Sequence, residues 1–334
     1  ASTGGKGSLL RHLFVCGPTH NREGEDFELL DEKTLSEIIA EASDHAQPYK
    51  DTVQVPDYLC SDEEIQALER QVNPSWAVLP EEITRQPSAE VSEGGRRAVS
   101  KEMGITMLRL ENGVRVMYKK TPFEKKQFTM EIHLLGGRAC EGYVEGIRTG
   151  ALSLGVQAAM ESGIAEHSYD AVVRYCQLHD LDYDMQPSFE GTTIQVSAST
   201  SQDDGLRRAF EIVHLLMSKT RVEEVAFERL QRLLVVNWES DRKNLETRTT
   251  RAMFDLLVHP TTEKRPDSRV IQVTPEDAAK LTIEDMHTAL DVEFTPDNLE
   301  VIIAGDFDEQ ELERCVLRYL GTLGGKREGK GGGS

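Results

Sequence analysis

The stretch ITMLRLENGVRVMYKK, residues 105–120, decides the fold that the sequence predicts. Apolar and β-branched residues stand on both sides of Asn112-Gly113, two residue types that tolerate a positive φ. Such a dipeptide favours a two-residue turn between antiparallel strands. The stretch therefore predicts a β-hairpin, and we expect a compact domain to begin just before it, near Gly104.

Strand and helix patterns continue from this hairpin towards the C-terminal end. A strand is expected over 127–137, where apolar and polar residues alternate, and a helix rich in small and apolar residues follows over 149–163. Two further strands are expected near 182–188 and 192–198, and a late strand near 298–307. The other expected helices lie at 169–179, 205–219, 222–240, 246–259, 283–294 and 309–320.

Hairpins dominate this order of elements, and the helices occur in blocks. The pattern predicts an α+β fold in which helices cover one face of a largely antiparallel sheet. Ser61, Ser168 and Thr282 stand where N-caps are expected, because each side chain can accept a hydrogen bond from the first turn of the helix that follows.

Residues 1–42 form a separate part ahead of this domain. They contain a short strand pattern at 12–17 and an amphipathic helix at 31–42. Strand, turn and acidic helix recur in that order at 299–320, so residues 1–42 are interpreted as the tail of a preceding repeat of the domain. Coincidence is the alternative, since strand-turn-helix units are common.

Residues 43–99 are rich in Pro, Glu, Ser and Gln, and they predict a partly helical linker that packs along a surface. The domain itself is predicted over 100–323, followed by a Gly-rich linker over 324–334. The Gly-rich ends and the missing initial Met suggest a piece of a longer chain. An apolar patch supplies the expected docking point of the linker: Trp76, Val78 and Leu79.

The chain has a formal charge of −20, from 58 Asp and Glu against 38 Lys and Arg in 334 residues. Such a surface repels phosphate backbones, so no nucleic acid partner is expected, and it attracts cationic peptides or a basic protein. Plain solubility is the alternative explanation of the charge. No apolar run reaches 18 residues, so no membrane partner is expected either.

Catalytic motifs are missing from the sequence. Its nine histidines form neither H-E-x-x-H nor H-x-x-E-H, and there is no G-x-S-x-G. The ligand-rich run 179–184 would place alternate side chains on opposite faces if extended, so a solvated helix end explains it better than a metal site. The cysteines form no C-x-x-C pair and are typical of inert thiols in a reducing compartment: Cys16, Cys60, Cys140, Cys176 and Cys315.

Four pieces of the sequence occur in an informative order. They are LENGVRVMYKK, a strand ending in GGRACEG, the helix GALSLGVQAAMESG, and the late stretch EVIIAGDFDEQELERCVLRYLGTL. Together they resemble one repeat of the M16 (pitrilysin or insulinase) metallopeptidases, over about Gly104 to Leu323. The likeness is greatest to a third, non-catalytic repeat in plastid precursor-processing members. It implies an M16/LuxS-type metallohydrolase-like fold, with residues 43–99 as the linker between two halves.

The active repeat of that family carries H-x-x-E-H on the helix that corresponds to 149–163, where two His bind zinc and the Glu acts as general base. By alignment, the histidine positions fall on Ser153 and Gln157, and the glutamate position falls on Val156. A third ligand, a Glu on a later helix, would fall near 233–238, where no carboxylate occurs. The resemblance therefore implies no catalytic residue, cofactor or metal in this chain, and no activity of the chain alone.

The resemblance implies a non-catalytic segment of a zinc endopeptidase that removes transit peptides from precursor proteins. Such a segment closes against the catalytic N-terminal half of the same protein, which is expected to hold the zinc, to form a closed peptide chamber. Transit peptides are Arg- and Ser-rich, so an acidic chamber wall favours these basic substrates. The implied location is the chloroplast stroma, with the protein soluble; no substrate-binding residue is assigned.

Two alternatives stay open. One is a non-catalytic M16-like scaffold or interaction module of a larger complex, and the other is an unrelated acidic α+β binding protein. A catalytic H-x-x-E-H repeat upstream in the full-length protein would favour the peptidase segment over both.

Overall fold

The computed structural model describes residues 31–45, 53–142, 144–201, 204–258 and 273–324. The chain divides into two compact units, residues 1–52 and 53–334. Helix α1 (Glu32–His45) is the described part of the first unit and agrees with the helix expected there. The strand expected over 12–17, Cys16 and the expected helix end at residue 259 lie outside the described residues.

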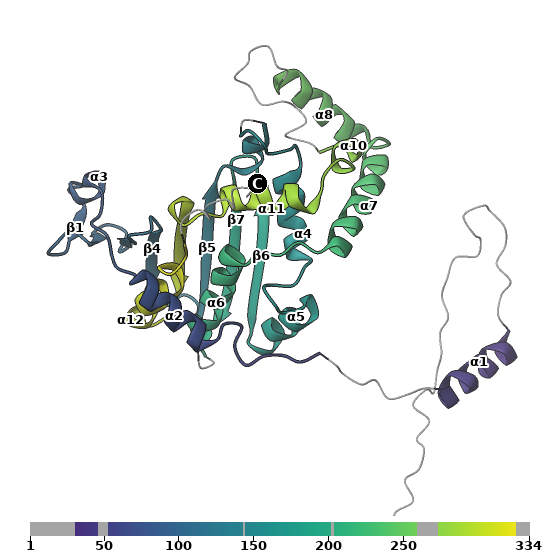
Figure 1. The fold of residues 1–334 in the computed structure, drawn as a ribbon, viewed down its shortest axis with the longest axis horizontal. Helices are drawn as coiled ribbons and strands as arrows, with labels where there is room; N and C mark the ends of the chain where they lie inside the picture. The colour runs from purple at the N-terminus through teal and green to yellow at the C-terminus, as the bar shows by residue number, and fades with distance from the viewer. Residues whose placement is uncertain (1–30, 46–52, 143, 202–203, 259–272, 325–334) are drawn as a thin grey trace, which may run out of the picture. The chain divides into compact units, whose positions relative to one another are not determined.

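An eight-stranded sheet forms the centre of the described part of the second unit (Figure 1). Every neighbouring pair of strands is antiparallel except β4 and β8, which are parallel, so the expected largely antiparallel sheet is confirmed. In spatial order the strands are β1 (Ala89–Val91), β2 (Arg97–Ser100), β3 (Thr106–Arg109), β4 (Arg115–Lys120), β8 (Leu299–Gly305), β5 (Gln127–Leu135), β7 (Gly191–Ser199) and β6 (Leu181–Pro187).

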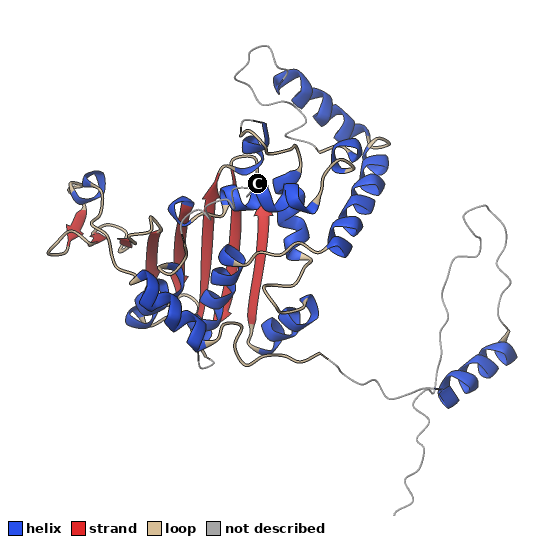
Figure 2. Ribbon diagram, viewed as in Figure 1, coloured by secondary structure: helices blue, strands red, loops and turns tan. Residues whose placement is uncertain are grey.

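Helices pack against this sheet (Figure 2). None of the described helices is long and apolar enough to cross a membrane. The α-helices are α2 (Asp62–Val72), α3 (Glu81–Thr84), α4 (Ala151–Met160), α5 (Tyr169–Leu178), α6 (Gly205–Ser218), α7 (Glu224–Asp241), α8 (Leu245–Val258), α10 (Pro275–Ala278), α11 (Ile283–Glu293) and α12 (Glu309–Cys315). The 3₁₀ helices are η1 (Gly137–Gly142) and η2 (Pro296–Asn298), and a π-helix, η3 (Val316–Leu320), follows α12.

The two faces of the sheet differ in burial. Along β5 the side chains alternate, with every second one in the core and its neighbours partly or fully exposed on the other face. Helix α4 packs against β6, and α6 packs against β7. The helices therefore cover one face, which confirms the predicted α+β architecture. The buried set on β5 is Phe128, Met130, Ile132 and Leu134.

The hairpin predicted at 105–120 is present as β3 and β4, with Thr106 opposite Tyr118 and Arg109 opposite Arg115. The N–H of Leu110 donates to the Val114 carbonyl, so the loop has three residues, 111–113, and not the two that the Asn-Gly dipeptide favours. Gly113 in its turn has a φ of +101°. A Cβ built on Gly113 would lie 2.7 Å from the Cα of Asp297. The turn therefore needs glycine both for its backbone conformation and for its close approach to η2.

The expected N-caps are confirmed. The side chains of Ser61, Ser168 and Thr282 each accept a hydrogen bond from a backbone N–H in the first turn of α2, α5 and α11. At Thr282 the bond is reciprocal, because the Asp285 carboxylate accepts the N–H of Thr282 in a capping box. Local sequence therefore fixes where these three helices begin.

The segment predicted as a linker contains more regular structure than expected. Strands β1 and β2 extend the sheet beyond β3, although they have three and four residues and give a weak pattern in the sequence. Trp76 forms an antiparallel bridge with Leu110. Leu79 is buried, whereas Val78 is 60% exposed, so the patch at 76–79 is attached by backbone pairing as well as by apolar burial.

Gly113→Ala is expected to destabilise the domain by about 2–4 kcal/mol, because the alanine Cβ meets the Asp297 backbone in a left-handed conformation. Urea unfolding followed by circular dichroism measures the loss. Gly104→Ala is the matched control, since Gly104 has a φ of +65° and a Cβ there would meet nothing within 4 Å. The control should lose only about 1 kcal/mol. Equal losses would contradict the close approach as the cause.

Candidate functional site

Helix α4 is the element on which the aligned zinc positions fall. Ser153 is buried, and its hydroxyl donates to the Gly150 carbonyl at 3.4 Å. The Val156 side chain is wholly inside the core, whereas Gln157 is exposed. The three positions therefore offer one hydroxyl, one alkyl group and one amide in different environments, and they form no set of metal ligands.

Gly155 in the middle of α4 is explained by packing. A Cβ at this position would lie 3.2 Å from the Cβ of Met286 and 3.5 Å from Leu290, both on α11. The two helices therefore approach more closely than a larger side chain allows. Packing against α11 is the role of this face of α4.

Glu141 caps α4 from outside the helix. Its carboxylate accepts hydrogen bonds from the N–H groups of Gly150 at 2.6 Å, Leu152 at 3.0 Å and Ser153 at 3.2 Å. Burial raises the pKa of Glu141, and these three bonds oppose the increase. Sequence reasoning missed this contact because the helix lacks a Ser, Thr, Asp or Asn cap next to its start.

The segment aligned with the third zinc ligand lies on α7. It contains no carboxylate. Its exposed apolar side chains are Leu233, Val235 and Val236. Across the part of the chain that the structure describes, no group of three or more His, Cys, Asp or Glu side chains could hold a metal ion. The residues present therefore do not fit the zinc site of a catalytic repeat.

Glu293, the last residue of α11, is a second buried carboxylate near the start of α4. It is 3% exposed, and its Oε2 accepts the N–H of Gly137 at 2.9 Å. Burial raises the pKa of Glu293 to about 7, and the nearby Glu141 adds to the increase. The contact ties the C-terminal end of α11 to η1, so both carboxylates hold the connection between β5 and α4.

The other residues singled out in the sequence do not assemble into a reactive centre. Burial raises the pKa of Cys60, Cys176 and Cys315 to about 12, which fits the predicted inert thiols. The run 179–184 begins at the end of α5 and continues into β6, so its side chains do not converge. Among the nine histidines, His214 on α6 is buried, its Nδ1 contacts the Tyr319 carbonyl at 2.8 Å, and burial lowers its pKa.

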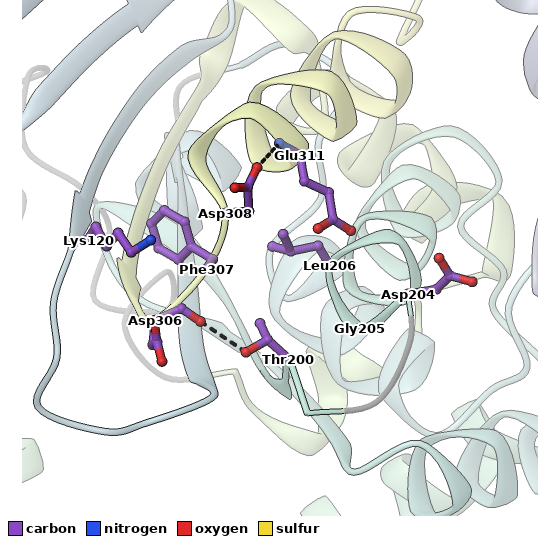
Figure 3. A pocket seen from close by; sticks show the side chains of 9 residues that line it. All are labelled: Lys120, Thr200, Asp204, Gly205, Leu206, Asp306, Phe307, Asp308 and Glu311. Atoms are coloured by element: carbon purple, nitrogen blue, oxygen red, sulfur yellow. Dashed lines mark hydrogen bonds between the residues drawn. The ribbon is translucent and has the colours of Figure 1, made fainter.

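An open pocket of about 540 Å³ lies where β4, β7, α6 and the start of α12 meet (Figure 3). Four carboxylates and one ammonium group line it, so its charge is negative. Its lining has neither His nor Cys to act as a base or nucleophile. The lining residues are Lys120, Thr200, Asp204, Gly205, Leu206, Asp306, Phe307, Asp308 and Glu311.

Most of these carboxylates already hold the surrounding chain in place. Asp308 caps α12 by accepting the N–H of Glu311 at 2.9 Å. Asp306 accepts the N–H of Lys126 at 3.0 Å, and its carbonyl accepts the Thr200 hydroxyl at 3.0 Å. The pocket therefore presents an acidic surface suited to a cationic group, and it contains no arrangement for chemistry.

A neighbouring open pocket of about 450 Å³ shares Lys120 and Asp308 with the first. Arg97 reaches it from β2 and pairs with Glu309 at 3.2 Å and Glu313 at 2.8 Å on α12. The acidic surface therefore continues around the first turns of α12.

These features define an α+β domain in which helices cover one face of a largely antiparallel sheet. Residues 280–332 match the family described as the Peptidase M16 inactive domain.

The chain is similar to the chloroplastic stromal processing peptidase of Arabidopsis thaliana, with 31% identity over 272 residues, 81% of this chain and 20% of that protein. It thus spans about a fifth of the length of that relative. Its fold is similar to the periplasmic protease PqqL from Escherichia coli, with a TM-score of 0.64 and 18% identity over 91% of this chain and 30% of that one. A peptidase M16 inactive domain from Pseudomonas fluorescens gives a TM-score of 0.56 and 11% identity, over 66% of this chain and 50% of that one.

The comparisons confirm the recognition made from the sequence. Residues 280–332 match the M16 inactive-domain family, and the chain is similar to stromal processing peptidases over most of its length. The alignment of the zinc positions with Ser153, Val156 and Gln157 stays a prediction.

Glu293→Gln is expected to flatten the pH dependence of stability. The pKa of Glu293 is about 7 in the folded chain against an ordinary 4.5, so between these pH values the folded chain binds a proton that the unfolded chain has lost. The contribution of Glu293 to the unfolding free energy therefore falls as the pH rises from about 4.5 to 7. The amide of Glu293→Gln does not titrate, so this variant should avoid a decrease of up to about 3 kcal/mol in unfolding free energy by pH 8. Urea unfolding at pH 5, 6, 7 and 8 measures the slope. Glu284→Gln, on the exposed start of α11, should leave the slope as in the parent chain; an unchanged slope in Glu293→Gln would refute the assignment.

Val156→Glu and Gln157→His test the surroundings of the aligned zinc positions. A carboxylate at Val156 enters the core without a partner, so a loss of about 3–5 kcal/mol in unfolding free energy is expected. Gln157→His changes an exposed side chain and should stay within about 0.5 kcal/mol. Thermal unfolding of both variants measures the difference. A well-tolerated glutamate at Val156 would show that the helix face is not sealed by packing.

Proposed function

We propose that this chain is a non-catalytic segment of a zinc endopeptidase that removes transit peptides from precursor proteins. The observation that carries the proposal is the 31% identity to a stromal processing peptidase over 81% of this chain. In this proposal the catalytic half of the same protein holds the zinc and cuts the peptide. This chain supplies a wall of the chamber in which the peptide is enclosed, and the protein works in the chloroplast stroma.

The charge of the chain supports a basic substrate. A formal charge of −20 and the acidic pockets around α12 favour approach of Arg-rich peptides through long-range attraction. The attraction does not require any single carboxylate to be free, because the field of the whole surface acts on the peptide. Salt screens such a field, with a Debye length of about 8 Å at physiological ionic strength.

A scaffold or interaction module of a larger complex is the second candidate. Large apolar side chains on α7 and α8 are exposed, and exposed apolar surface of this kind favours contact with another protein. A catalytic half of the same protein or a subunit of an unrelated complex would each cover these apolar side chains. The exposed side chains with their exposed fractions are Val236 (62%), Leu245 (78%) and Leu256 (80%).

Cleavage of a basic transit-type precursor by the catalytic half, with and without this chain added, tests the proposal. A gain of tenfold or more in kcat/KM is expected with the chain, and no cleavage by the chain alone. The gain should shrink as NaCl rises from 50 to 500 mM. A folded chain that gives no gain would contradict the peptidase assignment and favour the scaffold. A gain that ignores salt would instead refute the electrostatic capture.

A further inference from the structure

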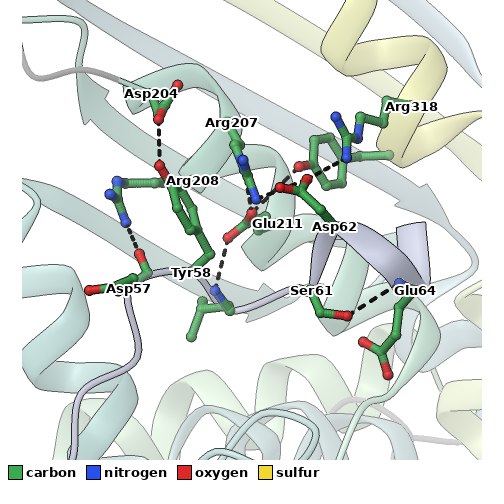
Figure 4. A network of polar contacts seen from close by, with 12 residues as sticks. Asp57, Tyr58, Ser61, Asp62, Glu64, Asp204, Arg207, Arg208, Glu211 and Arg318 are labelled. Carbon is green, nitrogen blue, oxygen red and sulfur yellow. Dashed lines mark hydrogen bonds and ion pairs between the residues drawn. The ribbon is translucent and has the colours of Figure 1, made fainter. Parts of the chain in front are cut away.

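Residues 57–72 form a strap that lies across α6 and η3 (Figure 4). The strap consists of an extended part, 57–61, and helix α2. It belongs to the region that the sequence predicts as a linker, yet it makes dense contacts with the domain. The contacts come from a small number of charged side chains.

Tyr58 provides the first anchor. Its hydroxyl donates to the Asp204 carboxylate at 2.6 Å. The guanidinium groups of Arg207 and Arg208 lie 3.7 Å and 4.6 Å from its ring centroid, which are cation–π distances. Arg208 also donates to the backbone carbonyl of Asp57. Removing the strap would leave both arginines without this aromatic partner.

Glu211 on α6 is the central contact, and its carboxylate is fully buried. Its Oε2 accepts the N–H of Leu59 at 2.9 Å, and its Oε1 pairs with Nε of Arg207 at 2.8 Å. A strap backbone donor therefore helps to satisfy a carboxylate inside the domain. When the strap undocks, water must replace the Leu59 N–H as the donor to the Glu211 carboxylate, which requires that the carboxylate becomes accessible to solvent.

Asp62 at the start of α2 connects the strap to a second element. Its Oδ1 lies 3.3 Å from Arg207 and 2.6 Å from Arg318 of η3. From the other side, Nε2 of His167 donates to the Leu59 carbonyl at 3.0 Å. The strap is thus held by α6, η3 and the segment before α5 together.

The docked arrangement also contains polar atoms that are poorly satisfied. The Nε atoms of Arg208 and Arg318 are buried and have no hydrogen-bond partner among the described residues. Buried donors without partners lower the cost of opening, because water satisfies them in the open state. Apolar anchoring comes from one partly buried side chain of the strap, Leu68, and from three buried ones: Leu59, Cys60 and Ile65.

We propose that residues 57–72 are a releasable strap with Glu211 as its latch, and that its docking sets the length of chain free to join this domain to the preceding part of the protein. When the strap is docked, its residues do not lengthen the connection between this domain and the preceding part of the protein. When it is released and fully extended, its residues lengthen that connection by about 50 Å. The role in the connection rests on the proposed function, since it concerns how far the two halves of a peptidase can separate; the latch itself is a property of this chain alone.

Hydrogen exchange of the 334-residue chain, followed by mass spectrometry, tests the latch. Amides of residues 62–72 are expected to exchange at least 100-fold faster than those of β5, because the strap opens without unfolding the sheet. Glu211→Gln should speed exchange in the strap a further tenfold and leave β5 within threefold. Glu63→Gln is the matched control, because its side chain is exposed on the same strap, and it should leave both rates unchanged.

Exchange of the strap at the rate of β5 in the parent chain would overturn the proposal, since the strap would then open only with the whole domain. If Glu211→Gln lowers protection everywhere, Tyr58→Phe decides, because it removes only the bond to Asp204. Faster exchange confined to the strap in Tyr58→Phe supports the latch, and an unchanged rate refutes it. These measurements use no catalytic half. A failed cleavage assay would therefore contradict the proposed function and leave the result on the latch unchanged.

Discussion

The position of β8 is the constraint on which the rest of the domain depends. This late strand lies between β4 and β5, parallel to the first and antiparallel to the second. One side of the sheet then consists of β1 to β4 and the other of β5, β7 and β6, with β8 as the connection. Its inward side chains Leu299, Val301 and Ile303 are completely buried. The core is therefore incomplete until residues near 305 have joined it, which gives the fold a high contact order.

Local patterns were enough to predict most elements. The Asn112-Gly113 turn, the caps at Ser61, Ser168 and Thr282, and the alternation along β5 each depend on neighbours in sequence, and each appears in the structure. The fold class followed from the order of these elements. The resemblance to M16 repeats also indicated which helix corresponds to the zinc-binding helix of a catalytic repeat, which periodicity alone does not indicate.

Long-range contacts were beyond such patterns. Nothing near Glu293 in the sequence indicates that its carboxylate meets the backbone of η1, because this contact exists only after β5 and α11 are in place. Glu141 is closer in sequence to the start of α4, but its contact follows no capping pattern. Strands β1 and β2 were missed for the same reason. Pairing of β2 with β3 and of β1 with β2, and not their own composition, makes them strands. The attachment of the strap through Glu211 likewise joins residues 152 positions apart.

The packing of α4 gives this helix a structural role in the domain. Its contacts with α11 depend on the absence of a side chain at Gly155, and its start is held by Glu141 from η1. Neither interaction uses a side chain at the positions predicted to align with the zinc site, because Glu141 contacts only the backbone N–H of Ser153. Val156, predicted to replace the general base, fills the core, and Gln157 faces solvent. The contacts made through Gly155 and Glu141 are thus independent of the side chains at the three aligned positions, although Val156 adds its own burial to the core.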